Sequence, residues 1–283
     1  MFHIKRYPVV ARDRESVEIY YNASDQPWLA LDDDDDTDRV DDAREHVIKA
    51  ALRLLAHGID GLRLDAMDDA PQSFWSELRE RVRFSHPSAL LLGEVVTDSL
   101  WFQAEARGAD VVTDFRIKNA LVDFVAKRTI DARAFVDSWM FARHRTGAFD
   151  ASFRLGFLDN HDTARFLSLA GGDVARLHIG LALLLFHDET AWVTYGTEAH
   201  LAAMRGERAL DNAWLERLPM PDPATVTTST RALIRDLCAL RRDMTRERAG
   251  AVRVVVADGS RLLLARRSHE LAVDVATGAL SFR

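Results

Sequence analysis

The chain has 283 residues, of which 48% are hydrophobic and 29% are charged. This is the composition of an ordinary globular protein, and it excludes disordered, collagen-like and low-complexity classes. The formal net charge is −7, from 37 basic and 44 acidic residues, and positions 32–42 supply all of it with eight Asp and one Arg. Because the other charges balance, there is no basic surplus to neutralise phosphates, which argues against a nucleic-acid partner.

The available residues also argue against a disulfide, a membrane span and a metal centre. Cys238 is the only cysteine, so it can form neither an internal disulfide nor a cysteine-based zinc site. The N-terminus lacks the apolar stretch of a secretory signal, and the longest apolar run, Ile179–Phe186, is far shorter than the roughly 20 residues that cross a bilayer. An EF-hand loop starting at Asp32 would need Gly and Glu where the chain has Thr37 and Ala43. We therefore expect a cytoplasmic protein with no membrane partner, no metal ion and no cofactor.

Helical and strand patterns alternate along most of the chain. Apolar residues at helical spacing predict helices over residues 40–57, 74–84, 117–127, 174–186 and 229–242. Short apolar runs between them predict strands over residues 59–65, 89–93, 110–112, 156–158 and 191–195. Gly58 is expected to end the first helix, and Ser229 to cap the last. This alternation predicts an α/β protein with a parallel sheet that is covered on both faces.

From Ala251 onward every second residue is apolar, instead of the helical spacing seen earlier, as in half-buried strands. Val252, Val254 and Val256 alternate with polar residues, and the same pattern recurs twice before residue 276. Asp-Gly and Thr-Gly pairs between these runs are typical of hairpin turns. We therefore expect two domains, an α/β domain over residues 1–245 and a truncated C-terminal β domain over residues 246–283.

Arg63 and Asp65 end the first predicted strand, and they share one face of it because side chains alternate along a strand. An arginine in this place keeps a neighbouring carboxylate ionised by pairing with it. An ionised carboxylate on a rigid strand suits the nucleophile of a covalent glycosidase mechanism. Taken alone, the pair is better explained as an ordinary buried structural ion pair.

Two further strand ends carry polar residues. Glu94 follows an apolar strand, so its pKa is expected to be raised, as a general acid requires. The alternative is a glutamate that faces water beyond the strand end. The fourth predicted strand ends in Asp159-Asn160-His161-Asp162, a run of hydrogen-bonding residues that fits a polar cleft better than a core.

Three segments together resemble the α-amylase family, glycoside hydrolase family 13. In order and spacing, Gly58–Asp65, Leu92–Val95 and Phe157–Asp162 are similar to three of its motif regions. Any one of these would be a moderate signal, whereas three in register are specific. The resemblance covers about residues 45–245.

Two more segments refine the resemblance. The stretch from Asp162 to Phe166, with Gly171-Gly172-Asp173, looks like the neopullulanase, cyclomaltodextrinase and maltogenic amylase branch. Thr194–Glu198 is similar to the segment at the eighth strand of the family's barrel.

The resemblance implies a (β/α)8 barrel of the TIM type that acts on α-glucosidic bonds with retention. By this match Asp65 is the nucleophile, Glu94 the acid/base and Asp162 the stabiliser of the transition state. Arg63 would hold Asp65, and His161 would bind sugar hydroxyls. The substrate would be an α-glucan oligosaccharide or polysaccharide such as starch, maltodextrin or cyclodextrin.

Part of the family pattern is absent. The first motif region is missing, and the five predicted strands correspond to the fourth to eighth of the barrel, which cannot close with five. The chain would then be the C-terminal part of a split gene, a decayed remnant, or a protein completed by a second copy or a complementing N-terminal chain. Asp68-Asp69 and Val96 also depart from the family pattern, at positions that shape the acceptor side.

Two functional hypotheses follow from these observations. The first is an active α-glucan hydrolase or glucanotransferase that keeps its three catalytic carboxylates. The second is a catalytically silent carbohydrate-binding remnant.

Overall fold

The computed structural model describes most of the chain and divides it into two compact units. The first unit is Met1–Val112 and the second is Thr113–Arg283. The residues described are 31, 37–96, 108–145, 154–202, 217–224, 226 and 228–283. The acidic run at positions 32–36 lies outside them.

The first unit contains parallel strands that pair in chain order. β1 (Gly61–Leu64) pairs with β2 (Leu90–Gly93) over four residues, from Gly61 opposite Leu90 to Leu64 opposite Gly93. β2 pairs in turn with β3 (Val111–Thr113), whose first two residues belong to this unit. This parallel register brings the carboxyl ends of β1 and β2 to the same edge.

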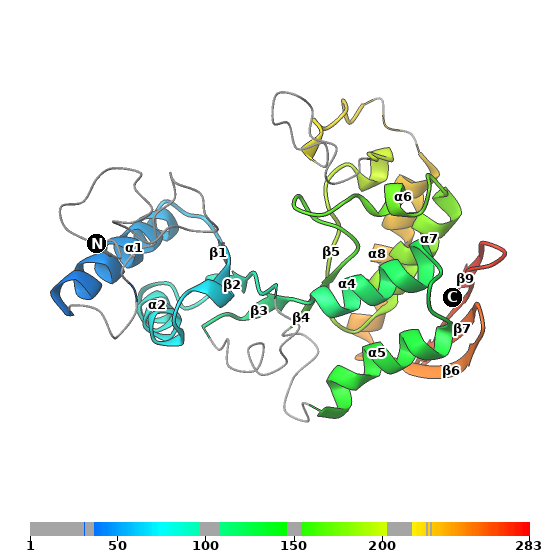
Figure 1. Ribbon diagram of the computed structural model, residues 1–283, viewed down its shortest axis with the longest axis horizontal. Helices are drawn as coiled ribbons and strands as arrows, with labels where there is room; N and C mark the ends of the chain where they lie inside the picture. Colours follow the sequence, from blue (N-terminus) through cyan, green and yellow to red (C-terminus); the bar gives the residue numbers. More distant parts are fainter. Residues whose placement is uncertain are drawn as a thin grey trace, which may run out of the picture. The chain divides into compact units, whose positions relative to one another are not determined.

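Two helices of the first unit supply its apolar core. α1 (Thr37–Ala56) and α2 (Gln72–Ser85) pack against each other, and the short 3-10 helix η2 (Met67–Asp69) follows β1 (Figure 1). Their fully or almost fully buried residues include Ile48, Met67, Phe74, Leu78 and Val82. Gly58 has a φ of 91° just beyond α1, in the left-handed region where glycine is favoured, as predicted for the helix end.

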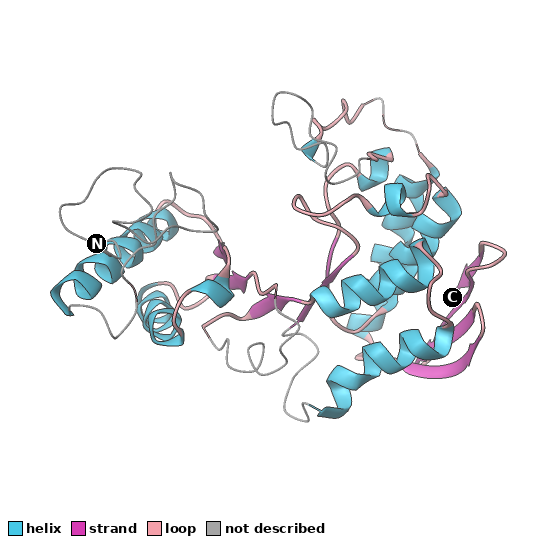
Figure 2. Cartoon of the chain, viewed as in Figure 1, coloured by secondary structure: helices cyan, strands magenta, loops and turns pink. Residues whose placement is uncertain are grey.

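The second unit is mainly helical (Figure 2). Its helices are α4 (Phe115–Leu121), the π-helix η3 (Val122–Ala126), α5 (Ala132–Arg145), α6 (Phe166–Leu169), α7 (Val174–Phe186), the 3-10 helix η5 (Thr197–Ala199) and α8 (Ser229–Arg246). The parallel strands β4 (Arg154–Phe157) and β5 (Thr190–Trp192) pair between them.

A four-stranded antiparallel sheet ends the second unit. β6 (Arg253–Asp258), β7 (Arg261–Arg266), β8 (His269–Asp274) and β9 (Ala279–Phe282) pair in chain order. α5 and α7 contact this sheet (Figure 1), and its residues Leu262, Leu264 and Leu271 are buried in the same apolar cluster as α7. The sheet and the helices of this unit therefore share one core.

The predicted helices and strands are confirmed within a few residues at each end, with three differences. The helix predicted over residues 117–127 is α4 continued by a π-helical turn, closed by the Lys127 N–H donating to the Val122 carbonyl. α8 is capped by Thr228, whose hydroxyl accepts the Arg231 N–H at 3.2 Å, so the prediction of Ser229 was wrong by one residue. α5, the four-residue α6 and the last strand β9 are absent from the predicted elements.

The predicted α/β class, with a parallel sheet and an antiparallel C-terminal sheet, matches the structure. The correspondence of the parallel strands to the fourth to eighth strands of a barrel stays a prediction, as does the domain boundary at residue 245. Within the described part of the chain, no helix is both long and apolar enough to span a membrane.

Candidate active site

Asp65 and Glu94 lie at the carboxyl ends of the paired strands β1 and β2. Each is the first residue after its strand, and the register that places Leu64 opposite Gly93 makes them adjacent. The backbone continues this pairing, because the Glu94 N–H donates to the Leu64 carbonyl at 2.8 Å and the Met67 N–H donates to the Glu94 carbonyl at 2.8 Å. The two predicted catalytic carboxylates of the first unit are therefore brought together by backbone hydrogen bonds.

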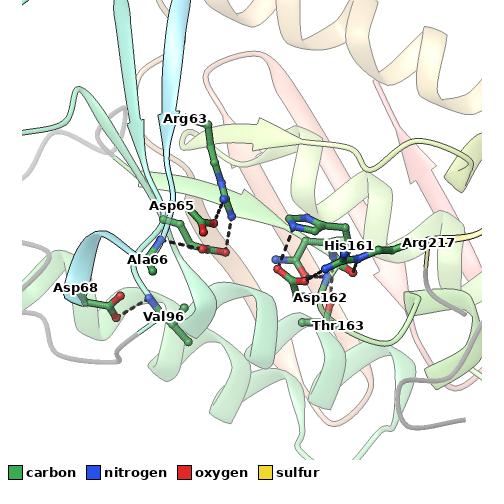
Figure 3. A network of polar contacts seen from close by, with 11 residues as sticks. Arg63, Asp65, Ala66, Asp68, Val96, His161, Asp162, Thr163 and Arg217 are labelled. Carbon is green, nitrogen blue, oxygen red and sulfur yellow. Dashed lines mark hydrogen bonds and ion pairs between the residues drawn. The ribbon is translucent and has the colours of Figure 1, made fainter. Parts of the chain in front are cut away.

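Arg63 holds both of these carboxylates (Figure 3). Its Nη1 pairs with Asp65 Oδ1, and its Nη2 lies 2.7 Å from Glu94 Oε1. The pairing with Asp65 is the contact predicted from the sequence. The pairing with Glu94 was not predicted, because it joins residues on different strands.

The two carboxylates have different surroundings. The side chain of Asp65 is 72% exposed and that of Glu94 is 9% exposed. Glu94 Oε2 also accepts the Ala66 N–H at 3.2 Å. The carboxylate of Glu94 therefore contacts a guanidinium and a backbone N–H although its side chain is buried.

The backbone turns sharply at Ala66, between Asp65 and η2. Ala66 has a φ of 44° and a ψ of 51°, a left-handed conformation that is uncommon for a residue with a side chain. Trp75 supports the turn by donating its Nε1–H to the Met67 carbonyl at 2.8 Å. Backbone strain of this kind persists only where the surrounding contacts enforce it, and it is often found at functional sites.

Asp68 and Val96, which both depart from the family pattern, contact each other. The Val96 N–H donates to Asp68 Oδ2 at 3.0 Å, which connects η2 to the segment after β2 (Figure 3). Asp68 and Val96 are therefore parts of one local arrangement at the rim of the Asp65–Glu94 pair.

His161 and Asp162 lie together in the second unit, in the loop after β4. His161 Nε2 is 3.0 Å from Asp162 Oδ2, and both side chains are 36% exposed (Figure 3). The Asp162 N–H donates to Asn160 Oδ1 at 3.0 Å. Asp159, at the base of the loop, is buried, and burial raises the pKa of its carboxyl above the ordinary value although Arg165 and the Phe166 N–H oppose this.

Arg217 is a residue of this second cluster that the sequence did not indicate. Its Nη2 lies 2.5 Å from Asp162 Oδ1, and its Nε–H donates to the His161 carbonyl at 3.0 Å (Figure 3). Arg217 is 55 residues from Asp162 in the chain, and no motif quoted from the sequence includes it. Only the folded structure reveals the pair.

The predicted site residues thus form two clusters, one in each unit. Arg63, Asp65 and Glu94 lie together in the first, and His161 and Asp162 in the second. That all five act on one sugar stays a prediction. Among the described residues, no group of three or more His, Cys, Asp or Glu side chains could hold a metal ion.

Curated proteins similar to this chain are named cyclomaltodextrinase, maltogenic α-amylase and neopullulanase. A cyclomaltodextrinase from a Bacillus species is 34% identical over 166 residues, a match that covers 56% of this chain and 29% of the relative. A cyclomaltodextrinase from Geobacillus thermopakistaniensis is 26% identical over 260 residues, covering 91% of this chain and 42% of the relative. The chain therefore spans less than half of the length of these relatives.

A solved structure and a family model agree with this similarity. The cyclic α-maltosyl-(1→6)-maltose hydrolase from Arthrobacter globiformis, solved with maltose, has the same fold with a TM-score of 0.81. It is 23% identical, and the match covers 96% of this chain and 60% of that one. The family model for the α-amylase catalytic domain matches residues 15–250. This match spans more than half of the chain, which therefore belongs to the α-amylase catalytic domain family.

Proposed function

We propose that this chain carries the catalytic carboxylates of a retaining α-glucan hydrolase. The observation that supports the proposal most is the Arg63-held pair of Asp65 and Glu94 at the ends of neighbouring parallel strands. Family membership implies a (β/α)8 barrel, in which catalytic residues come from strand ends. The relatives' names, which include cyclomaltodextrinase, maltogenic amylase and neopullulanase, support cyclodextrins, maltodextrins and related glucans as substrates.

In this mechanism Asp65 attacks the anomeric carbon and forms a covalent glycosyl ester. Its exposure leaves it accessible to a sugar, and Arg63 pairs with its carboxylate. Glu94 gives a proton to the departing glycosidic oxygen and then takes one from the water that hydrolyses the ester. A retaining pair needs its carboxyl groups about 5–5.5 Å apart, which two adjacent strand ends can provide.

Glu94 must therefore carry a proton when the substrate arrives. In the free site its carboxylate contacts Arg63 and the Ala66 N–H. A bound sugar would displace water and bring an oxygen close to Glu94, and a desolvated carboxyl binds its proton more tightly. Asp162 would stabilise the positive charge that develops on the ring, and His161 would bind sugar hydroxyls.

The partners of the chain are also proposals. An α-glucan is the substrate, and a second copy or a complementing N-terminal chain would complete the barrel, because the relatives are more than twice as long as the matched part. The cytoplasm is the proposed location, which the name of one relative, the intracellular maltogenic amylase of Bacillus subtilis, supports.

The test is hydrolysis of maltodextrin and cyclodextrin by the wild type and by Asp65→Asn, Glu94→Gln and Asp60→Asn. Asp65→Asn and Glu94→Gln should each lower kcat by more than about 1,000-fold, as losses of paired catalytic groups do. Asp60→Asn is the matched control, because Asp60 is exposed just before the start of the same strand β1. Proton NMR should show that the first product has the α configuration.

Three outcomes would reject the proposal. These are equal activity of Asp65→Asn and wild type, a β-configured first product, and an inactive wild type. The second candidate is a silent carbohydrate-binding remnant. Calorimetric binding of maltoheptaose without any hydrolysis would establish it.

A further inference from the structure

The loop that carries His161 and Asp162 has an exposed tip and a buried base. We call residues 159–165 the Asp162 loop. The side chains of Asp159 and Arg165, at its two ends, are 4% and 2% exposed, whereas Asp162 at its tip is 36% exposed. Burying a charged pair at the two ends of a short loop costs desolvation free energy, which further contacts of the two side chains must offset.

Arg165 fastens the base of the loop to the segment after β5. Its Nη2–H donates to the Tyr195 carbonyl at 2.5 Å, and its guanidinium carbon lies 5.5 Å from the centre of the Tyr195 ring. Its Nη1 is 3.6 Å from Asp159 Oδ1, at the other end of the loop. One guanidinium therefore connects both ends of the loop and the neighbouring strand.

Asp159, at the other end of the loop, also contacts the segment after β5. Its Oδ2 accepts the Phe166 N–H at 2.6 Å, and its backbone carbonyl accepts the Thr194 hydroxyl at 2.5 Å. Between these fixed ends, Asn160 accepts the Asp162 N–H through Oδ1 and donates its own N–H to the Thr163 hydroxyl. A short chain of hydrogen bonds thus links the backbone of Asp162 to the base of the loop, whereas His161 and Arg217 contact its carboxylate.

We propose that Arg165 is a positioning residue that sets the place of Asp162 by holding the base of the Asp162 loop against the end of β5. Its catalytic consequence rests on the proposed function, whereas its effect on the loop does not. A lysine cannot replace it, because a single ammonium does not provide the planar fork that reaches Tyr195 and Asp159 together. If Arg165 had only a structural role, replacing it would destabilise the whole unit. It would not specifically accelerate amide hydrogen exchange in the Asp162 loop.

The first experiment measures amide hydrogen exchange in the wild type, Arg165→Lys and Arg241→Lys. Arg241 is the matched control, because its guanidinium also donates to backbone carbonyls, those of Leu185, His187 and Glu189, but at the opposite end of β5. In Arg165→Lys, exchange over residues 158–166 should be at least tenfold faster, with α7 unchanged. Arg241→Lys should leave the exchange of the Asp162 loop as in the wild type.

The second experiment measures steady-state hydrolysis of maltodextrin by the same proteins. Arg165→Lys should lower kcat at least tenfold and change KM less than threefold, because a displaced Asp162 loses contacts made in the transition state. Arg241→Lys should change neither constant by more than twofold. Should Arg165→Lys fail to fold, Asp159→Asn tests the same contact from the carboxylate side, with the same expected changes.

The outcomes separate the two proposals. Unchanged loop exchange in Arg165→Lys, equal acceleration in Arg241→Lys, or a rise in KM with kcat unchanged would overturn the positioning role. An inactive wild type would refute the proposed function, and hydrogen exchange would then decide the positioning role alone.

Discussion

Arg63 is the residue on which the first cluster depends. Its guanidinium pairs with the exposed Asp65 and with the almost wholly buried Glu94. An ionised carboxylate that is buried without a cation is unfavourable, so Glu94 needs this contact more than Asp65 does. The same side chain therefore contributes to stability through Glu94 and to the proposed chemistry through Asp65.

Replacing Arg63 should consequently destabilise the protein as well as inactivate it. We expect Arg63→Met to lower the free energy of unfolding by about 2 kcal/mol, less than for a fully buried pair because Arg63 is itself 32% exposed. Urea unfolding at neutral pH measures this. Arg81→Met is the matched control, since Arg81 pairs with Glu45 at the surface of the same unit and its loss should leave stability unchanged. Equal losses in the two variants would contradict this account.

Among the elements of the first unit, α2 is attached to the sheet through Asp110, just before β3. Arg79 and Arg83 of α2 both pair with this carboxylate, and the Leu91 N–H of β2 donates to its Oδ2 at 2.8 Å. Burial by itself would raise the pKa of Asp110, but Arg83, the Leu91 N–H and Arg79 outweigh it, so the pKa is lowered. The ionised form of Asp110 thus joins a helix to two strands.

This lowered pKa predicts how stability depends on pH. A carboxyl whose pKa is lower in the folded state stabilises the fold above its ordinary value of 3.8, and this contribution is lost as the pH falls through the folded pKa. Asp110→Asn should therefore cost about 1 kcal/mol at pH 7, a figure reduced for solvent screening. The difference from the wild type should shrink in urea unfolding as the pH falls below 3.8 and should disappear only below the folded pKa. A difference that stays constant with pH would show that packing, and not charge, is responsible.

At the scale of the whole molecule, the antiparallel sheet is part of the core of the second unit. Val252, Leu262 and Val273 are buried with the residues of α7. Backbone contacts add to this packing, because the Ala132 N–H at the start of α5 donates to the Gly259 carbonyl at 2.8 Å. The sheet therefore covers apolar helix surface that would otherwise face water.

A truncated chain that ends at Glu247, just after α8, tests whether the C-terminal sheet forms a domain of its own. We expect the truncation to expose the apolar faces of α5 and α7, so that the second unit loses cooperative unfolding and the protein aggregates. Size-exclusion chromatography and hydrogen exchange in α7 measure these effects. Full protection of α7 in the truncated protein would instead establish the predicted boundary at residue 245.

Much of this protein is readable from short stretches of its sequence. Strands β1 and β2, helix α7 and the polar residues at strand ends follow from local periodicity, since burial of one face imposes a regular spacing on apolar residues. The Arg63–Asp65 pair was predictable for the same reason, because two residues of one strand share a face. α5 was accessible in principle, as its buried Ala132, Phe135 and Trp139 have helical spacing.

The contacts that join distant residues were decided only by the tertiary structure. Arg63 reaches Glu94 because the parallel register aligns the ends of β1 and β2, and Arg217 reaches Asp162 across 55 residues of chain. Asp159 and Arg165 lie within one loop, but their contacts with Thr194 and Tyr195 come from the segment after β5. Periodicity specifies which face of an element is buried, whereas the partner of a charged side chain depends on register and crossover geometry, which no local pattern encodes.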